Sequence, residues 1–263
     1  MPPKHPQLFV TELRIPASLN TETAKSFDMG MDFWARRILS LVLIGLFVTG
    51  VVFPRGDAKQ SSPGLDGVGI GTTCGSPSEE CSAQFLNTTS ANDVVVIIVR
   101  HVAGSIIDSS GLKFTLRIFA GGISEYYAIA RTPLRMDNVT VVLQHCCALG
   151  VQVFAIHGAN TRIVFDPRAE FPQIVSNCGF SIGFGPCSGS IETATHDLII
   201  ASTLLNDEGC PEASSVSEGF ARVGGNGFFE VDYRIIERVQ HDINFTYPRE
   251  AVSIVLDAVS LSP

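Results

Sequence analysis

Two patterns of apolar residues divide this chain. The run over residues 38–53 holds 16 residues without a charge, whereas the part after Lys59 alternates short apolar runs with clusters of Gly, Ser, Pro and Asp. An uncharged run of this length is typical of an export signal or of a membrane-crossing helix. The sequence therefore predicts an N-terminal export or transmembrane helix over residues 38–53 and a secreted or membrane-anchored domain after it.

The charges beside the apolar run predict its orientation. Arg36 and Arg37 directly precede it, and basic residues on that side keep residues 1–37 in the cytoplasm or make them the n-region of a signal peptide. The rest of the chain then lies outside the cytoplasm, either secreted or anchored to the cell membrane by this one helix.

Cleavage and retention of the helix are both open. Gly56-Asp57-Ala58 places small residues where a signal peptidase acts, and Met29 and Met31 lie where a signal peptide would begin. On that reading residues 1–28 are an upstream extension that is not translated. A run of 16 residues lies between the lengths typical of a signal core and of a membrane span, so an uncleaved anchor remains the alternative.

The composition after the export segment limits the partners. Residues 59–263 carry 12 basic and 21 acidic side chains, a net charge of −9. Such a surface repels the phosphates of nucleic acids and of anionic membranes. The sequence also carries no motif for a cofactor, so the expected partners are glycans or other surface proteins, and the oligomeric state stays open.

The cysteines indicate an oxidising compartment. All seven follow the export segment, and the sequence contains neither a C-x-x-C pair nor a Cys/His cluster typical of a metal site. Cys178 with Cys187 and Cys74 with Cys81 would each close a short loop, and these are the predicted disulfides. Cys210 is the competing partner for the first pair. Three sequons make Asn87, Asn138 and Asn244 candidate glycosylation sites.

The chain after residue 90 has the pattern of an all-β domain. Residues 59–90 are rich in Gly, Ser, Thr and Pro and are predicted to form a linker. Beyond them, runs of β-branched and aromatic residues separated by turn residues predict strands. The predicted strands cover residues 94–99, 114–119, 125–130, 138–144, 151–156, 197–204, 228–235, 243–247 and 252–261.

The predicted strands fall into two similar groups. Asp93 opens the first group and Asp197 opens the second, 104 residues later, each followed by an apolar run. A single group would leave an apolar face in water, so the two should pack together. We therefore expect one β-sandwich domain over residues 91–263, with about eight strands from two similar halves.

Several short motifs resemble a module of secreted prokaryotic surface proteins. They are a strand entry at 108–114 (DSSGLKF), a strand with Tyr126-Tyr127-Ala128, a strand end at 154–160 (FAIHGAN), and a restart of the pattern at 196–200 (HDLII). The resemblance covers residues 90–261. It implies a jelly-roll-like sandwich of surface and adhesion proteins, without an established catalytic set. The long insert between Cys178 and Cys187 departs from the pattern.

The end of one predicted strand gathers polar residues. A strand that ends near His157 continues into a loop, so His157, Asn160, Thr161, Arg162 and Asp166 are the predicted rim of a ligand site. The alternative is structural, because Asn160 and the Asp166-Pro167 pair also favour turns. Asp108 begins a short polar loop that lacks the spacing of a calcium loop, and we expect a plain turn there.

The catalytic alternatives lack a pattern. The sequence has no G-x-S-x-G elbow, and Glu230 and Asp232, which alternation places on one face of a strand, are expected to form an exposed acidic face. We therefore expect a binding, adhesion or structural surface module without catalysis. A carbohydrate-active enzyme would instead show two carboxylates across a cleft. A filament or sheath subunit would exchange the segment 59–90 with the sheet edge of a neighbour.

Overall fold

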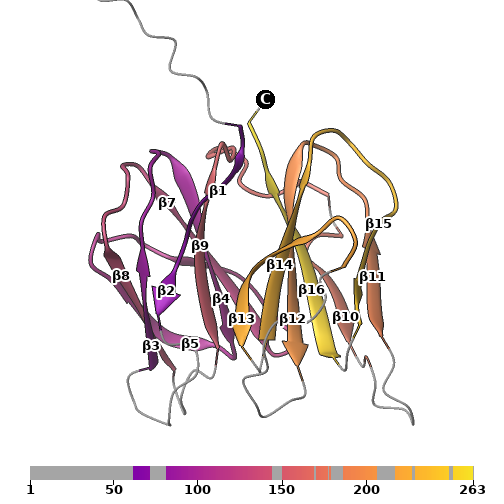
Figure 1. Cartoon of the computed structure of the whole chain (residues 1–263), viewed down its shortest axis with the longest axis horizontal. Coiled ribbons are helices and arrows are strands. Elements are labelled where there is room, and N and C mark those ends of the chain that lie inside the picture. Colours follow the sequence, from indigo (N-terminus) through magenta and orange to yellow (C-terminus); the bar gives the residue numbers. More distant parts are fainter. Residues whose placement is uncertain are drawn as a thin grey trace, which may run out of the picture. The chain divides into compact units, whose positions relative to one another are not determined.

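The computed structural model describes residues 62–71, 81–143, 150–168, 170–176, 178, 186–205, 217–226, 229–248 and 251–262. Residues 59–263 form one compact unit. Every regular element of the described residues is a β-strand, so the prediction of an all-β domain is confirmed (Figure 1). Residues 1–61, with the predicted helix, lie outside the described part. Within the described residues, the structure has no helix of the length and apolarity that a membrane span requires.

The strands form two similar repeats. Repeat 1 contains β1 (Gly64–Val68), β2 (Ile70–Gly71), β3 (Cys81–Leu86), β4 (Asp93–Arg100), β5 (Ala103–Asp108), β6 (Thr115–Ala120), β7 (Ile123–Ala130), β8 (Asp137–Leu143) and β9 (Val151–His157). Repeat 2 contains β10 (Gln173–Ser176), β11 (Cys187–Ile191), β12 (Asp197–Leu205), β13 (Ala221–Asn226), β14 (Phe229–Ile236), β15 (Ile243–Tyr247) and β16 (Ala251–Ser260).

The strand order shows the similarity directly. Inner sheet 1 has the order β1-β9-β4-β7-β6, and inner sheet 2 has the matching order β10-β16-β12-β14-β13. Outer sheet 1 has the order β2-β3-β8-β5, and outer sheet 2 contains the matching pair β11-β15. The register shift between Leu116 and Ile118 in β6 recurs between Arg222 and Gly224 in β13. The sequence similarity of the two groups therefore corresponds to a repeated fold.

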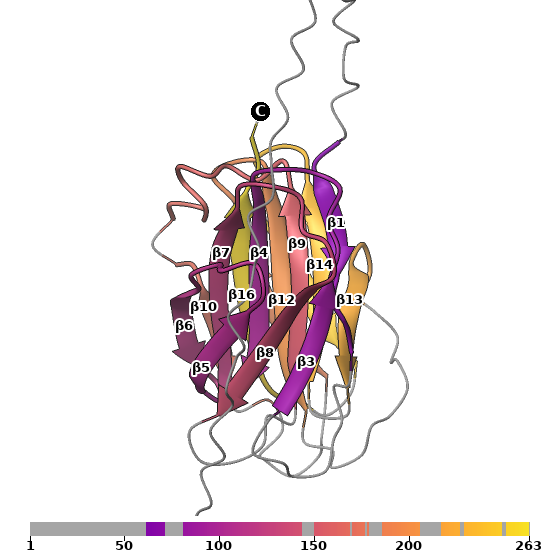
Figure 2. The ribbon, with the colours of Figure 1, turned by 90° about the vertical axis from the view of Figure 1, so that its left-hand side faces the viewer.

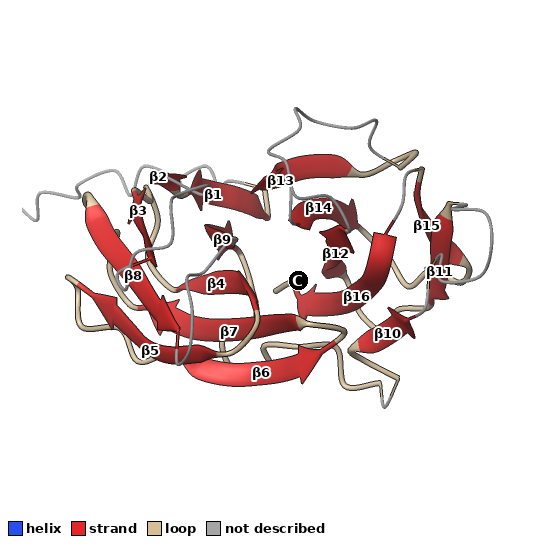
Figure 3. Ribbon diagram, turned by 90° about the horizontal axis from the view of Figure 1, so that it is seen from below, coloured by secondary structure: helices blue, strands red, loops and turns tan. Residues whose placement is uncertain are grey.

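The four sheets form four layers, and a hydrophobic core fills each of the three spaces between them. Figure 3, seen along the strands, shows outer sheet 1, inner sheet 1, inner sheet 2 and outer sheet 2 in this order from left to right. In Figure 2 the strands of outer sheet 1 lie in front of inner sheet 1 and are inclined to it. The central core joins side chains of the two inner sheets, and one further core lies between the inner and outer sheet of each repeat.

The long apolar runs of the sequence follow from this layering. In β4, Val96 and Ile98 face the central core, whereas Val95 and Ile97 face outer sheet 1. Because side chains alternate along a strand and both faces of an inner sheet are covered, β4 has no polar face. β12 is also buried along its whole length. Each fully buried Val or Ile contributes roughly 1.5–3 kcal/mol to the stability of the fold.

The expected single sandwich differs from the observed arrangement. Each half of the chain has two sheets and a core of its own, and the two halves stack through their inner sheets. All nine predicted strands overlap observed strands, but β1, β2, β3, β5, β10, β11 and β13 were missed. Most of these are short or rich in Gly and Ser, and all but β3 lie at sheet edges, where little apolar sequence is needed.

The prediction of a linker over residues 59–90 is wrong for the described part of that segment, because β1 pairs with β9 and β3 pairs with β8. The glycines that suggested a linker are needed where backbones approach closely. A Cβ on Gly67 would lie 2.1 Å from the carbonyl oxygen of Asn87, and one on Gly71 would lie 2.2 Å from that of Ala83.

The predicted disulfide between Cys178 and Cys187 is present. It connects the chain after β10 to the first residue of β11. Cys74, the predicted partner of Cys81, lies outside the described residues, as does Cys210.

A charged contact joins the repeats beside the central core. Arg117 on β6 donates to both carboxylate oxygens of Asp257 on β16, at 2.8 and 3.2 Å, and its guanidinium lies 4.2 Å from the centre of the Phe165 ring. Glu125 on β7 is buried beside this pair. Burial raises the pKa of Glu125 well above its ordinary value, and the nearby charge of Asp257 adds to the rise.

Candidate functional site at the seam between the repeats

The predicted ligand loop is the connection between the two repeats. β9 ends at His157, and Gly158, at φ +75°, turns the chain towards the C-terminal strand. The amide of Asn160 donates to the carbonyl of Ser260 at 2.8 Å, and the amide of Ser262 donates to the carbonyl of Gly158 at 2.7 Å. These bonds hold the end of β9 against the end of β16.

A hollow of about 400 Å³ opens beside this connection, and we call it the seam hollow. A Cβ on Gly158 would lie within 3.1 Å of three Pro63 atoms, so glycine is required there for space as well as for its φ angle. The lining mixes polar and apolar groups without a carboxylate, and consists of Pro63, Ala91, Asn92, His157, Gly158, Ala159, Thr161 and Ser262.

His157 is the titratable group of the seam hollow. Its Nδ1 lies 3.3 Å from Oδ1 of Asp93, which is fully buried, while 24% of the His157 side chain is exposed. A carboxylate behind one ring nitrogen fixes the orientation of an imidazole. Nε2, on the other side of the ring, is then the nitrogen that remains for a ligand.

A second carboxylate lies behind Asp93. Asp66 on β1 accepts hydrogen bonds from the amides of Thr89 and Ser90, both at 2.7 Å, and from the Thr89 hydroxyl. Burial raises the pKa of Asp66, but these hydrogen bonds outweigh burial and hold it below its ordinary value. Burial raises the pKa of Asp93 to about 6, and the neighbouring Asp66 adds to the rise while His157 opposes it. Asp93 therefore exchanges its proton in the mildly acidic range, directly behind His157.

Repeat 2 contains the same acidic pair without the histidine. Burial raises the pKa of Asp197 to about 6, and Asp166 accepts the amide of Ala194 at 2.7 Å, three residues before Asp197. Asp197 pairs in register with Ser260 and accepts a hydrogen bond from Thr195 at 2.6 Å. Because both repeats keep the two aspartates, the pair belongs to the scaffold. The imidazole is specific to repeat 1.

The structure brings together two of the five predicted rim residues, since His157 and Thr161 both line the seam hollow. Asn160 accepts the amides of Arg162 and Ile163 at 3.0 and 3.1 Å, which stabilises the turn. Asp166 is buried and accepts backbone amides. Arg162 is exposed outside the hollow. Asn160 and Asp166 thus have the turn roles that their residue types also favoured.

Sequence reasoning missed Asp66 and Asp93 as parts of this site. Asp66 lay in the predicted linker, and the pattern identified Asp93 only as the start of a strand. Their contact depends on the pairing of β1 with β9 and of β9 with β4. Among the described residues, the structure contains no group of three or more His, Cys, Asp or Glu side chains arranged to hold a metal ion.

The acidic residues of β14 differ from the expectation. Glu230 and Asp232 lie on one strand face as predicted, but both are buried, so the expected exposed acidic face is wrong. Burial raises the pKa of Asp232 to about 8, and Glu230 adds to the rise while Arg222 opposes it. Both oxygens of Asp232 lack a hydrogen-bond partner among the described residues.

Each repeat also contains a further hollow. The hollow of repeat 1, of about 360 Å³, includes Lys113 and Arg131. The hollow of repeat 2, of about 610 Å³, is lined by Glu218, Asp242 and Arg234 among others.

The candidate glycosylation sites are accessible to different degrees. Asn87 and Asn244 are exposed, and Asn138 is half-buried. Asn138 on β8 and Asn244 on β15 occupy equivalent positions of the two outer sheets, because their cross-strand partners are Phe85 on β3 and Ser190 on β11.

No family model, curated protein or solved structure matches this chain.

Proposed function

We propose that this protein is a surface module that binds a small polar ligand, such as a saccharide, in the seam hollow, and that it performs no catalysis there. One observation carries the proposal: His157 reaches this hollow with its ring held by a buried aspartate, at a position where repeat 2 has Ser260. An oriented imidazole beside the hydroxyls of Thr161 and Ser262 suits the hydroxyl groups of a sugar.

The absence of a carboxylate from the lining supports binding over hydrolysis. Glycoside hydrolysis requires two carboxylates beside the substrate, whereas Asp93 is fully buried behind His157. We extend the proposal to location and family. The domain is exported, through a cleaved signal or a retained anchor, and it resembles the jelly-roll-like modules of prokaryotic surface proteins. The order β1-β9-β4-β7 against β3-β8-β5 is jelly-roll-like and supports that resemblance.

A carbohydrate-active enzyme is the second candidate, and one observation favours it. Glu218 and Asp242 both line the open hollow of repeat 2, together with Arg234. Strand exchange is less well supported, because β1 and β3 already pair within their own chain.

Glycan-array binding followed by calorimetry tests the proposal on the full-length protein. We expect His157→Ala to weaken binding of any saccharide ligand at least tenfold. His196→Ala is the matched control, because His196 is an exposed histidine that does not line the seam hollow. Equal binding by both variants would refute the seam site. Release of reducing sugar that is lost in Glu218→Gln would establish the enzyme instead.

The proposed export of the domain requires a separate measurement. N-terminal sequencing of the native product should find a start at or near Lys59 if the signal is cleaved. An intact N-terminus ahead of the apolar run would establish the anchor.

A further inference from the structure

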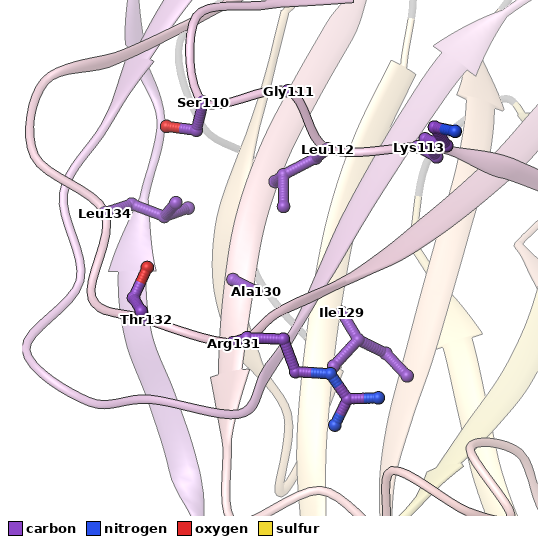
Figure 4. A pocket seen from close by; sticks show the side chains of 9 residues that line it. All are labelled: Ser110, Gly111, Leu112, Lys113, Ile129, Ala130, Arg131, Thr132 and Leu134. Atoms are coloured by element: carbon purple, nitrogen blue, oxygen red, sulfur yellow. The ribbon is translucent and has the colours of Figure 1, made fainter.

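The hollow of repeat 1 differs in charge from the rest of the domain, and we call it the basic hollow. It lies between the loop that follows β5 and the loop that follows β7 (Figure 4). In Figure 4 the hydroxyls of Ser110 and Thr132 lie on one side, the charged groups of Arg131 and Lys113 lie towards the other, and Leu112 and Ala130 lie between them. The basic hollow thus combines an apolar floor with four hydrogen-bond donors.

Hydrogen bonds fix both loops in place. Oδ1 of Asp108 accepts the amides of Ser110 and Leu112, both at 2.9 Å, which is the turn expected from the sequence. On the opposite side, the amide of Leu134 donates to the Thr88 hydroxyl at 2.9 Å, and the amide of Thr88 donates to the Leu134 carbonyl at 3.1 Å. A site with fixed walls loses little conformational entropy when it binds a ligand.

The donors of the basic hollow are unused within the described residues. Neither Lys113 nor Arg131 lies within 4 Å of a described carboxylate, and the hydroxyls of Ser110 and Thr132 have no hydrogen-bond partner in the described part. Asp137 is buried, and its Oδ1 accepts Ser109 Oγ and the Ser110 amide. The basic hollow therefore places two cations without a described counter-ion together in a domain of net charge −9.

Repeat 2 has no cation at the equivalent positions. Thr115 and Ala221 correspond, as do Tyr127 and Tyr233, so Lys113 corresponds to Gly219 and Arg131 corresponds to Glu237. The scaffold therefore does not require cations at this position, and their presence in repeat 1 calls for a separate explanation.

We propose that the basic hollow binds the sulfate or carboxylate group of an acidic saccharide. The guanidinium of Arg131 and the ammonium of Lys113 neutralise the anion, the hydroxyls of Ser110 and Thr132 on the other side donate to hydroxyl oxygens of the sugar, and Leu112 and Ala130 pack against the apolar face of the sugar ring. This site is separate from the seam hollow and stands without it.

Calorimetry with three hexasaccharides tests the proposal: one sulfated, one made of uronic acids and one neutral. We expect the full-length protein to bind at least one of the acidic chains and to bind the neutral chain at least tenfold more weakly. The binding should weaken severalfold when the salt concentration rises from 50 to 300 mM. A preference between sulfate and carboxylate identifies the group that the site recognises.

The matched variants separate a built site from general charge. Lys113→Gln/Arg131→Gln should lower the affinity for the acidic chain at least tenfold. Arg135→Gln/Arg162→Gln removes the same charge from two exposed arginines outside the basic hollow and should lower it less than twofold. Equal losses in the two double variants, or no binding of either acidic chain, would overturn the proposal. His157→Ala should leave this affinity unchanged, so failure of the seam site and failure of this one are distinguishable.

Discussion

The two repeats share a scaffold and differ in their placement of charged side chains. Both keep a buried aspartate at the start of the central strand, and both use a threonine to hold the loop before the next outer strand, Thr88 with Leu134 and Thr193 with Gln240. At other equivalent positions a charged residue of one repeat is replaced by an uncharged residue in the other. Tyr127 and Tyr233 pair in register with the first residues of β6 and β13, so Glu125 corresponds to Val231.

This comparison separates structural requirement from candidate function. A polar group found in both repeats serves the fold, as Asp93 and Asp197 do. A polar group that only one repeat has, and that makes no contact between the repeats as Arg117 does, is not required by the shared scaffold. His157, Lys113 and Arg131 are of this second kind, and they line the seam hollow and the basic hollow.

Separation of the repeats should have the largest effect. A chain that ends at residue 168 keeps repeat 1 but exposes the inner face of β4 and β9, including Val96 and Phe154. We expect this fragment to aggregate or to unfold without cooperativity, because each repeat lacks cover for one apolar face. Circular dichroism during urea unfolding, with the mass from size-exclusion chromatography, checks it. A cooperative transition from a monomeric fragment would contradict the interdependence of the repeats.

Loss of the charged contact between the repeats should come next. Arg117→Met leaves Asp257 and Glu125 buried without a counter-ion, and we expect a loss of about 3–5 kcal/mol in the free energy of unfolding at pH 8. The loss should be smaller at pH 5 than at pH 8, because burial raises the pKa of both carboxyl groups and protonation removes their uncompensated charge. Urea unfolding at the two pH values measures it. Arg162→Met, at an exposed arginine, is the control, and an equal loss there would refute the role of Arg117.

The buried pair Glu230 and Asp232 on β14 should determine part of the pH dependence of the unfolding free energy. Asp232 loses its proton near pH 4 in the unfolded chain and near pH 8 in the folded protein. Between these values the folded state binds more protons, so stability falls as pH rises, by up to about 1.4 kcal/mol per pH unit from this group. Asp232→Asn should flatten the curve of unfolding free energy between pH 5 and 8. Asp242→Asn, at an exposed carboxylate, should not, and a parallel change in both variants would disprove this origin.

The disulfide should have a smaller effect. Replacement of Cys178 and Cys187 by serine should lower the free energy of unfolding by about 2–3 kcal/mol, because the crosslink restricts the unfolded chain. Peptide mapping without reduction should recover this pair. It should also recover Cys74 with Cys81, since Cys81 and Cys187 pair with the equivalent residues Val141 and Tyr247. A peptide that joins Cys210 to Cys178 or Cys187 would contradict the first pairing.

Part of the candidate site was predictable from the sequence. His157 and Thr161 end a strand and begin a loop, and this local pattern placed them at a rim. The basic hollow was not predicted, because Lys113 and Arg131 lie on separate loops that approach only through β6 and β7. Glu230 and Asp232 were predicted on the correct face of the strand, but they are buried and not exposed as predicted. Alternation determines which side chains share a face, and it does not determine whether another sheet covers that face.

The sequence by itself determined the strand class, the central strands and the existence of two similar groups. These properties depend on the local alternation of apolar and polar residues and on long β-branched runs, which indicate strands buried on both faces. The tertiary structure alone decided that there are four layers, that the glycine-rich segment before β4 forms strands, and that Asp66, Asp93 and His157 meet. Edge strands need few apolar residues, and contacts between distant strands depend on register and on the sheet that covers each face.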